Sequence, residues 1–243
     1  MTPQTEKSAR KKAAPLNLGI EWSAEWRTRD QLPTLLNKLG LTGVGVEVGV
    51  ERAHHATQLR RNWDGKLLVL VDKWEVNQNY AACTRERHLQ SHDEAMQHIK
   101  NATKPIEVIK MWSTDAAQHI KGLDDVNQIK RLWNGGLDFV YLDADHSYTA
   151  VKNDLESWLP LIRPGGIICG HDFVSDGFHI PGDPITAYET AEASGAADAC
   201  PFGVQRAVLE RFSADVVKLT SPETDLGWRS WLVQVPELAH HQV

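Results

Sequence analysis

The segment from Leu137 to Phe173 constrains the fold more than any other, because it predicts a strand, a loop, a helix, a turn and a second strand in succession. The first strand, Leu137–Leu142, leads into Asp143-Ala144-Asp145-His146, and the second, Ile167–Gly170, leads into His171-Asp172. Two strands joined by a helix pair in parallel, so both end at one edge of a sheet. Carboxylates and imidazoles gathered at that edge favour a divalent metal, an acid–base group, or both.

The helix between these strands has a clear amphipathic pattern. Ser147 is a suitable N-cap, and Arg163-Pro164-Gly165-Gly166 is expected to end the helix before the next strand. The apolar residues that share one face are Tyr148, Val151, Leu155, Trp158, Leu159 and Ile162.

The same alternation of strands and helices extends over most of the chain. It predicts an α/β fold, a Rossmann-like, doubly wound and mainly parallel sheet with a C-terminal antiparallel edge hairpin. The expected strands are 44–50, 66–71, 106–111, 216–219 and 231–235, and the expected helices are 30–39, 53–63, 88–101, 204–212 and one that opens at 115–120.

Length and composition limit the classes of protein to consider. The 243 residues suit one domain over 16–243, with a disordered basic tail over 1–15 and a lid insertion over 174–202. A net charge of −6 gives no support for a nucleic-acid partner. The three cysteines have no CxxC spacing, and no apolar run predicts a membrane span or a signal peptide. These features predict a cytoplasmic protein without a membrane partner, and leave a homo-oligomer open.

The loop after the first strand differs from a dinucleotide-binding turn. The glycines of Gly43-Val44-Gly45-Val46-Glu47-Val48-Gly49-Val50 do not form GxGxxG at a strand-to-helix turn. Glu47 near this loop disfavours a phosphate and suits a cationic ligand. Asp72, at the end of the next strand, is placed to accept both hydroxyls of a ribose. Together these two acidic residues favour a nucleoside ligand without phosphates.

A set of short motifs, in this order and spacing, carries a resemblance to a known family. The motifs are Glu47-x-Gly49, Asp72, Ser113-Thr114-Asp115, Asp143-x-Asp145-His146, Arg163-Pro164-Gly165-Gly166 and His171-Asp172. From about Gly43 to Phe212 the chain resembles class I S-adenosylmethionine-dependent methyltransferases. The resemblance is greatest to the small metal-dependent O-methyltransferases of the catechol type and those that act on natural-product sugars. It implies methyl transfer from S-adenosylmethionine to a hydroxyl oxygen of a small molecule.

The resemblance also implies a role for individual residues. Asp143, His171 and Asp172 would bind a divalent cation, Mg²⁺ or Mn²⁺, and Asp145 or His146 would be the catalytic base, with Asp145 preferred. Among the tryptophans, Trp74 and Trp112 are the two expected to be placed for adenine stacking. The residues expected to bind the cofactor are Glu47, Gly49, Val50, His55, Asp72, Lys73, Trp112, Ser113 and Asp143.

Two departures from the family pattern keep alternatives open. The usual later glycines of the first loop are replaced in Val50-Glu51-Arg52-Ala53, and His171 stands where metal-dependent relatives usually carry a carboxylate. An imidazole favours softer ions than magnesium, such as manganese, cobalt or zinc. Alternatively, His171 only orients the site, and Asp143 and Asp172 hold a magnesium together with waters. A metal-free enzyme with His171 as base is the third alternative. The alternative functions are a nicotinamide-dependent oxidoreductase and a non-catalytic protein that binds S-adenosylmethionine.

Overall fold

The computed structural model describes residues 25–75, 85–133, 135–174, 203–224 and 228–236. The predicted tail over 1–15 and the predicted lid, apart from Val174, lie outside the described residues. Within the described part of the chain, no helix combines the length and apolar character needed to cross a membrane.

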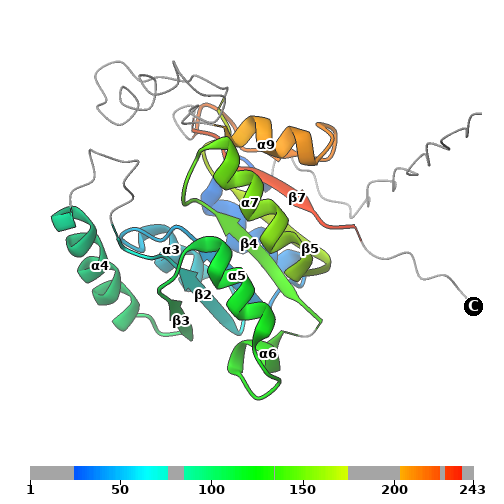
Figure 1. Ribbon diagram of the computed structural model, residues 1–243. Helices are drawn as coiled ribbons and strands as arrows, with labels where there is room; N and C mark the ends of the chain where they lie inside the picture. Colours follow the sequence, from blue (N-terminus) through cyan, green and yellow to red (C-terminus); the bar gives the residue numbers. More distant parts are fainter. Residues whose placement is uncertain (1–24, 76–84, 134, 175–202, 225–227, 237–243) are drawn as a thin grey trace, which may run out of the picture.

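Seven strands form one sheet in the order β3-β2-β1-β4-β5-β7-β6 (Figure 1). The first five pair in parallel, whereas β7 runs antiparallel to β5 and β6 antiparallel to β7, which confirms the predicted edge hairpin. The strands are β1 (Val44–Val48), β2 (Leu67–Val71), β3 (Ile106–Ile109), β4 (Leu137–Leu142), β5 (Ile162–Gly170), β6 (Lys218–Leu219) and β7 (Trp231–Gln234).

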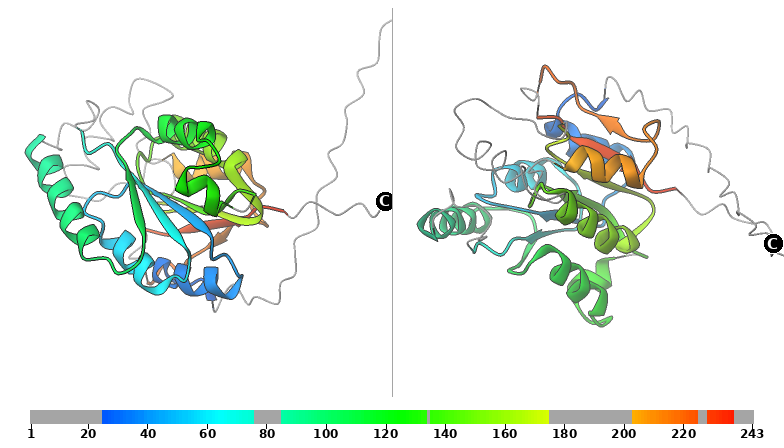
Figure 2. Two further views of the ribbon diagram at one scale, coloured as in Figure 1. Left: turned by 90° about the horizontal axis from the view of Figure 1, so that it is seen from below. Right: turned by 45° about the horizontal axis from the view of Figure 1, so that its top comes forward.

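Helices cover both faces of this sheet, so the fold has three layers (Figure 2). Helices α5, α6, α7 and α9 pack on one face, and α2, α3 and α4 on the other. The helical segments are η1 (Arg29–Gln31), α2 (Leu32–Lys38), α3 (His54–Asn62), α4 (Arg85–Lys100), α5 (Ser113–Gly122), α6 (Gln128–Leu132), α7 (Tyr148–Trp158), η2 (Leu159–Leu161) and α9 (Val204–Arg211).

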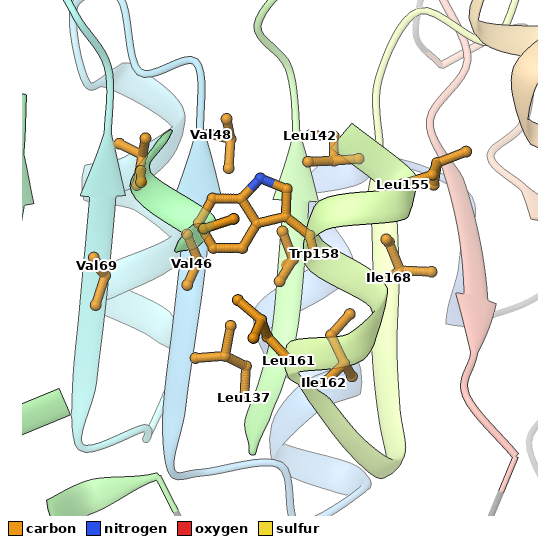
Figure 3. Packing of buried hydrophobic residues seen from close by; sticks show 14 of the residues in the cluster. Val46, Val48, Val69, Leu137, Leu142, Leu155, Trp158, Leu161, Ile162 and Ile168 are labelled. Atoms are coloured by element: carbon orange, nitrogen blue, oxygen red, sulfur yellow. The ribbon is translucent and has the colours of Figure 1, made fainter. Parts of the chain in front are cut away.

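Trp158 of α7 is the largest side chain in the core between the sheet and α7. It is completely buried, and Figure 3 shows its indole lying over the sheet among Val46, Val48 and Leu142. The predicted apolar face of this helix therefore packs on β1 and β4. Helix α7 begins directly after the loop that carries Asp145, with Ser147 as its N-cap.

Two local predictions differ from the structure. Arg163-Pro164-Gly165-Gly166 was expected to form a turn, but these residues lie inside β5, where the pairing with β4 shifts register. The strand is held there by Asp138, which accepts hydrogen bonds from Arg163 Nε at 2.6 Å and from the Gly43 amide. Helix α6 was not predicted at all, because five residues are too few to establish a helical pattern.

Candidate active site

The candidate site lies where the sheet reverses its strand order, between β1 and β4. Hydrogen bonds continue past the strand ends: Gly49 N donates to Val71 O, Asp143 N to Val48 O and His171 N to Leu142 O. These bonds bring the residues that follow β1, β4 and β5 to one edge. In open α/β sheets, ligands bind in the crevice at such a reversal of strand order.

Two carboxylates and two imidazoles meet at this edge, as the sequence predicted. His146 Nε2 lies 3.0 Å from Asp172 Oδ2 and 3.8 Å from Asp143 Oδ1, and His171 Nδ1 lies 3.0 Å from Asp172 Oδ1 and 3.9 Å from Asp143 Oδ1. Asp172 adopts a left-handed backbone, with φ of 54°, a conformation that Asp tolerates better than most residues.

These four groups strongly perturb one another. Burial would lower the pKa of His146, but the Asp172 and Asp143 carboxylates outweigh it and raise that pKa to about 10. Burial would also lower the pKa of His171, and its hydrogen bond to Asp172 and the Asp143 carboxylate raise it instead. Burial would raise the pKa of Asp172, but the two imidazoles lower it. Burial raises the pKa of Asp143. The carboxylates and imidazoles at this edge therefore interact electrostatically as one cluster.

The donor set fits a divalent cation. One ligand atom from each of Asp143, His146 and Asp172 can be chosen so that all three lie within 4.8 Å of one another. Carboxylate oxygen and imidazole nitrogen together suit manganese and similar ions. The histidine in this group is His146, whereas the sequence suggested His171 for that place.

Asp145 lies beside His146 and His171 but is not one of the three candidate metal ligands. Its Oδ1 accepts a hydrogen bond from Ser147 N at 2.8 Å, which fixes the loop just before α7. Asp145, His146, His171 and Asp154 line one small hollow at the end of β4.

Asp154 of α7 is a buried carboxyl that the sequence interpretation did not consider. It is 5% exposed and accepts a hydrogen bond from Ser113 Oγ at 2.5 Å; Ser113 in turn accepts one from Trp158 Nε1 at 2.9 Å. Burial raises the pKa of Asp154 to about 7. The signal was present in the sequence, because Asp154 falls on the apolar face of the predicted helix.

The first loop keeps the left-handed backbone that is typical of glycine, although other residues replace its later glycines. Glu51 and Ala53 both have positive φ, 47° and 60°, as does Gly49 with 88°. Asp72 fastens this loop: its Oδ2 accepts from Val50 N at 2.9 Å and from Glu51 N at 3.0 Å. Asp72 therefore lies where the sequence places it, but its carboxylate already bonds the loop backbone.

Glu47 and His55 form a buried pair on the α3 side of the sheet. Glu47 is 2% exposed, and His55 Nδ1 lies 3.5 Å from its Oε1. The His55 ring also stacks against Tyr141, with ring centroids 4.4 Å apart. Among the described residues, neither Glu47 Oε2 nor His55 Nδ1 has a hydrogen-bond partner, so both retain the capacity to bind a polar ligand.

The residues that the sequence predicts to border the adenine lie at the ends of β2 and β3. Trp112 is 51% exposed, and Lys73 Nζ lies 3.0 Å from the centroid of its ring system. Ser113 follows as the first residue of α5. Trp74 is only 4% exposed and donates from Nε1 to Glu51 O, so its ring belongs to the core and is not available for stacking.

Comparison with known proteins adds an independent finding. Residues 43–173 match the family model described as a methyltransferase domain. No curated protein matches the sequence.

The fold also resembles solved structures. The O-methyltransferase from Bacillus cereus, in complex with SAH, aligns with 86% of this chain and 80% of its own at 20% identity and a TM-score of 0.54. The O-methyltransferase TomG from Streptomyces achromogenes, in complex with SAM and involved in tomaymycin synthesis, aligns with 86% of this chain and 79% of its own at 18% identity and a TM-score of 0.50. At these identities the resemblance concerns the fold.

Proposed function

We propose, because this chain belongs to the family of methyltransferase domains, that it transfers a methyl group from S-adenosylmethionine to a hydroxyl oxygen of a small molecule, assisted by a divalent cation. The observation that carries the proposal is the meeting of Asp143, His146 and Asp172 at the reversal of strand order, beside the loop fastened by Asp72. The SAH and SAM complexes of two proteins with this fold support the choice of cofactor.

The cofactor-binding roles follow the path along the sheet edge. Glu47 and His55, buried and incompletely hydrogen-bonded, would bind the amino and carboxylate groups of the methionine part. Asp72 would bind the ribose side, because it follows β2 and flanks the first loop, and Lys73 beside it would move off the Trp112 ring when the cofactor binds. Trp112 and Ser113 would border the adenine, and Gly49 and Val50 would form the floor between these parts. Asp143 would lie between the cofactor and the acceptor.

Asp143 and Asp172 would hold the cation, with His146 as the third ligand and His171 as the orienting neighbour. When bound, a divalent ion supplies Lewis acidity that makes a hydroxyl easier to deprotonate. Asp145 would accept the hydroxyl proton, because it lines the hollow with both histidines while standing outside the ligand group. His146 remains the alternative base. A positioned base typically contributes about a hundred- to ten-thousand-fold to the rate.

The first test is calorimetric titration of S-adenosylmethionine into metal-stripped protein, with NAD as the control ligand. We expect saturable binding of S-adenosylmethionine alone. The Trp112→Ala variant should bind it about 5- to 150-fold more weakly, since stacking of a base on an aromatic ring is worth about 1–3 kcal/mol. Met111→Ala is the matched control, because Met111 is also exposed and precedes Trp112. Binding of NAD and not of S-adenosylmethionine would refute the proposal.

The second test separates the two bases. Transfer of a labelled methyl group should fall at least a hundredfold in whichever of the two variants, Asp145→Asn or His146→Gln, lacks the base. If Asp145 is the base, Asp145→Asn should lose turnover while its affinity for a divalent ion is unchanged. His146→Gln should instead bind the ion more weakly. Full turnover in both variants would contradict the proposed proton transfer.

A further inference from the structure

Arg29 is a charged side chain at the candidate site that none of the assigned roles uses. Its Nη1 lies 3.7 Å from Asp143 Oδ2, and the side chain is 36% exposed. Arg29 thus brings a permanent positive charge from the N-terminal part of the chain to the end of β4.

The backbone that presents Arg29 is fixed from two sides. Thr28 caps the η1 turn in a reciprocal pair with Gln31. Ser221 N, from the segment after β6, donates to Arg27 O at 2.9 Å. The backbone position of Arg29 at the site edge is therefore fixed.

Arg29 interacts with Tyr141 as well as with Asp143, and its guanidinium has donors beyond these two contacts. Within the described residues its guanidinium makes no hydrogen bond to a carboxylate, since the separation from Asp143 exceeds hydrogen-bond length. A guanidinium has five N–H donors in a planar fork. If Asp143 binds a cation, as proposed above, Arg29 shares its nearest carboxylate with that ion. Arg29 would then lie beside the acceptor hydroxyl, because the same ion would bind that hydroxyl.

We propose that Arg29 selects acceptors that carry a carboxylate in addition to the methylated hydroxyl, an inference that rests on the proposed methyl transfer at Asp143. A planar carboxylate matches the fork in a bidentate arrangement. A doubly charged phosphate fits less well. The Asp143 and Asp30 carboxylates, which also interact with Arg29, would repel a phosphate more strongly than a singly charged carboxylate. The acceptor class is therefore hydroxy acids.

Binding to protein loaded with SAH and Mg²⁺ tests this without turnover. The probes are acids and their neutral amides: 3,4-dihydroxybenzoate with 3,4-dihydroxybenzamide, and lactate with lactamide. Glycerol 3-phosphate is the phosphate probe. The variants are Arg29→Gln, Arg29→Lys and, as a control with the same change of charge, Arg27→Gln, whose residue is exposed. SAH affinity, measured first on each protein, confirms folding and tests the proposed function separately.

We expect the wild type to bind one acid about 10- to 100-fold more tightly than its amide, the range for a hydrogen bond to a charged group. Arg29→Gln should abolish that preference, Arg29→Lys should retain part of it, and Arg27→Gln should leave it unchanged. Equal binding within both pairs, binding of neither pair, or binding of glycerol 3-phosphate alone would overturn the inference, even if SAH binds. Failure of SAH to bind any of these proteins would instead overturn the proposed function.

Discussion

The first loop illustrates how a backbone conformation persists when the residue that usually supplies it is replaced. Gly49, Glu51 and Ala53 all have positive φ, which is costly for residues with a Cβ. A Cβ added at Gly49 would lie 2.0 Å from Asp143 O, whereas Glu51 is exposed. The glycine is required at the first position, and the other two positions tolerate strain.

Substitutions at Gly49 and Glu51 should therefore change the stability of the fold in opposite directions. Gly49→Ala should destabilise the fold by at least about 2 kcal/mol, from left-handed strain and the clash with Asp143. Glu51→Gly should be neutral or stabilise by up to about 1 kcal/mol, because relief of about 1–2 kcal/mol of strain exceeds the greater flexibility of glycine when unfolded. Chemical unfolding of both variants measures the difference. Destabilisation by Glu51→Gly would mean that its side chain holds the loop.

Asp154 should make stability depend on pH. Burial raises its pKa from the ordinary value of 3.8 to about 7, so its favourable contribution is complete below about pH 4 and is lost as the pH rises through 7. Asp154→Asn should remove this loss, and its melting temperature should exceed that of the wild type at pH 8 by about 2–4 °C for each kcal/mol involved. Glu156→Gln, at an exposed position of α7, is the control. A variant less stable at every pH would show that the folded protein needs the negative charge.

At the scale of elements, the ends of β2 and β3 carry a contact that cofactor binding should break. Lys73 Nζ covers the Trp112 ring on which adenine is proposed to stack. A cation over an exposed ring is worth about 0.5–1 kcal/mol. Lys73→Met should therefore bind S-adenosylmethionine about 2- to 5-fold more tightly by calorimetry, while Lys110→Met, at an exposed position close to Trp112 in sequence, should not change the affinity. Weaker binding by Lys73→Met would show that Lys73 contacts the cofactor directly.

The elements themselves were largely predictable because hydrophobic periodicity determines them. The buried strands β1, β2 and β4 appear where the pattern places them, with ends shifted by at most two residues. Helix α7 begins as predicted but ends at Trp158, so that Ile162, expected on its apolar face, is the first residue of β5. The prediction of a turn at Arg163-Pro164-Gly165-Gly166 was wrong, because the composition is that of a turn. Pairing of β5 with β4, backbone hydrogen bonds of Gly165 and Gly166 with Val235, and the Asp138–Arg163 ion pair hold these residues as a strand. Local sequence does not contain that information.

At the scale of the whole molecule, part of the candidate site could be predicted from the sequence and part could not. Asp72, Asp143, His171 and Asp172 could be placed together from sequence, because parallel strands end at one edge. Arg29 could not, since it reaches Asp143 only through the packing of η1 against segments far along the chain. The sequence thus predicts the groups on strand ends, and the structure adds the groups that approach from other elements.

Cation binding should change how the stability of the whole protein depends on pH. The pKa of His146 is raised to about 10, so without metal its stabilising charge is complete below about pH 6.5 and is lost as the pH rises to 10. Mn²⁺ should therefore raise the melting temperature more at pH 9 than at pH 7, because a ligand imidazole must be unprotonated. His146→Gln should lose both the metal-free pH dependence and most of the Mn²⁺ effect, whereas His171→Gln should retain part of each. If Mn²⁺ stabilises His146→Gln fully and His171→Gln not at all, His171 is the ligand, as the sequence first suggested.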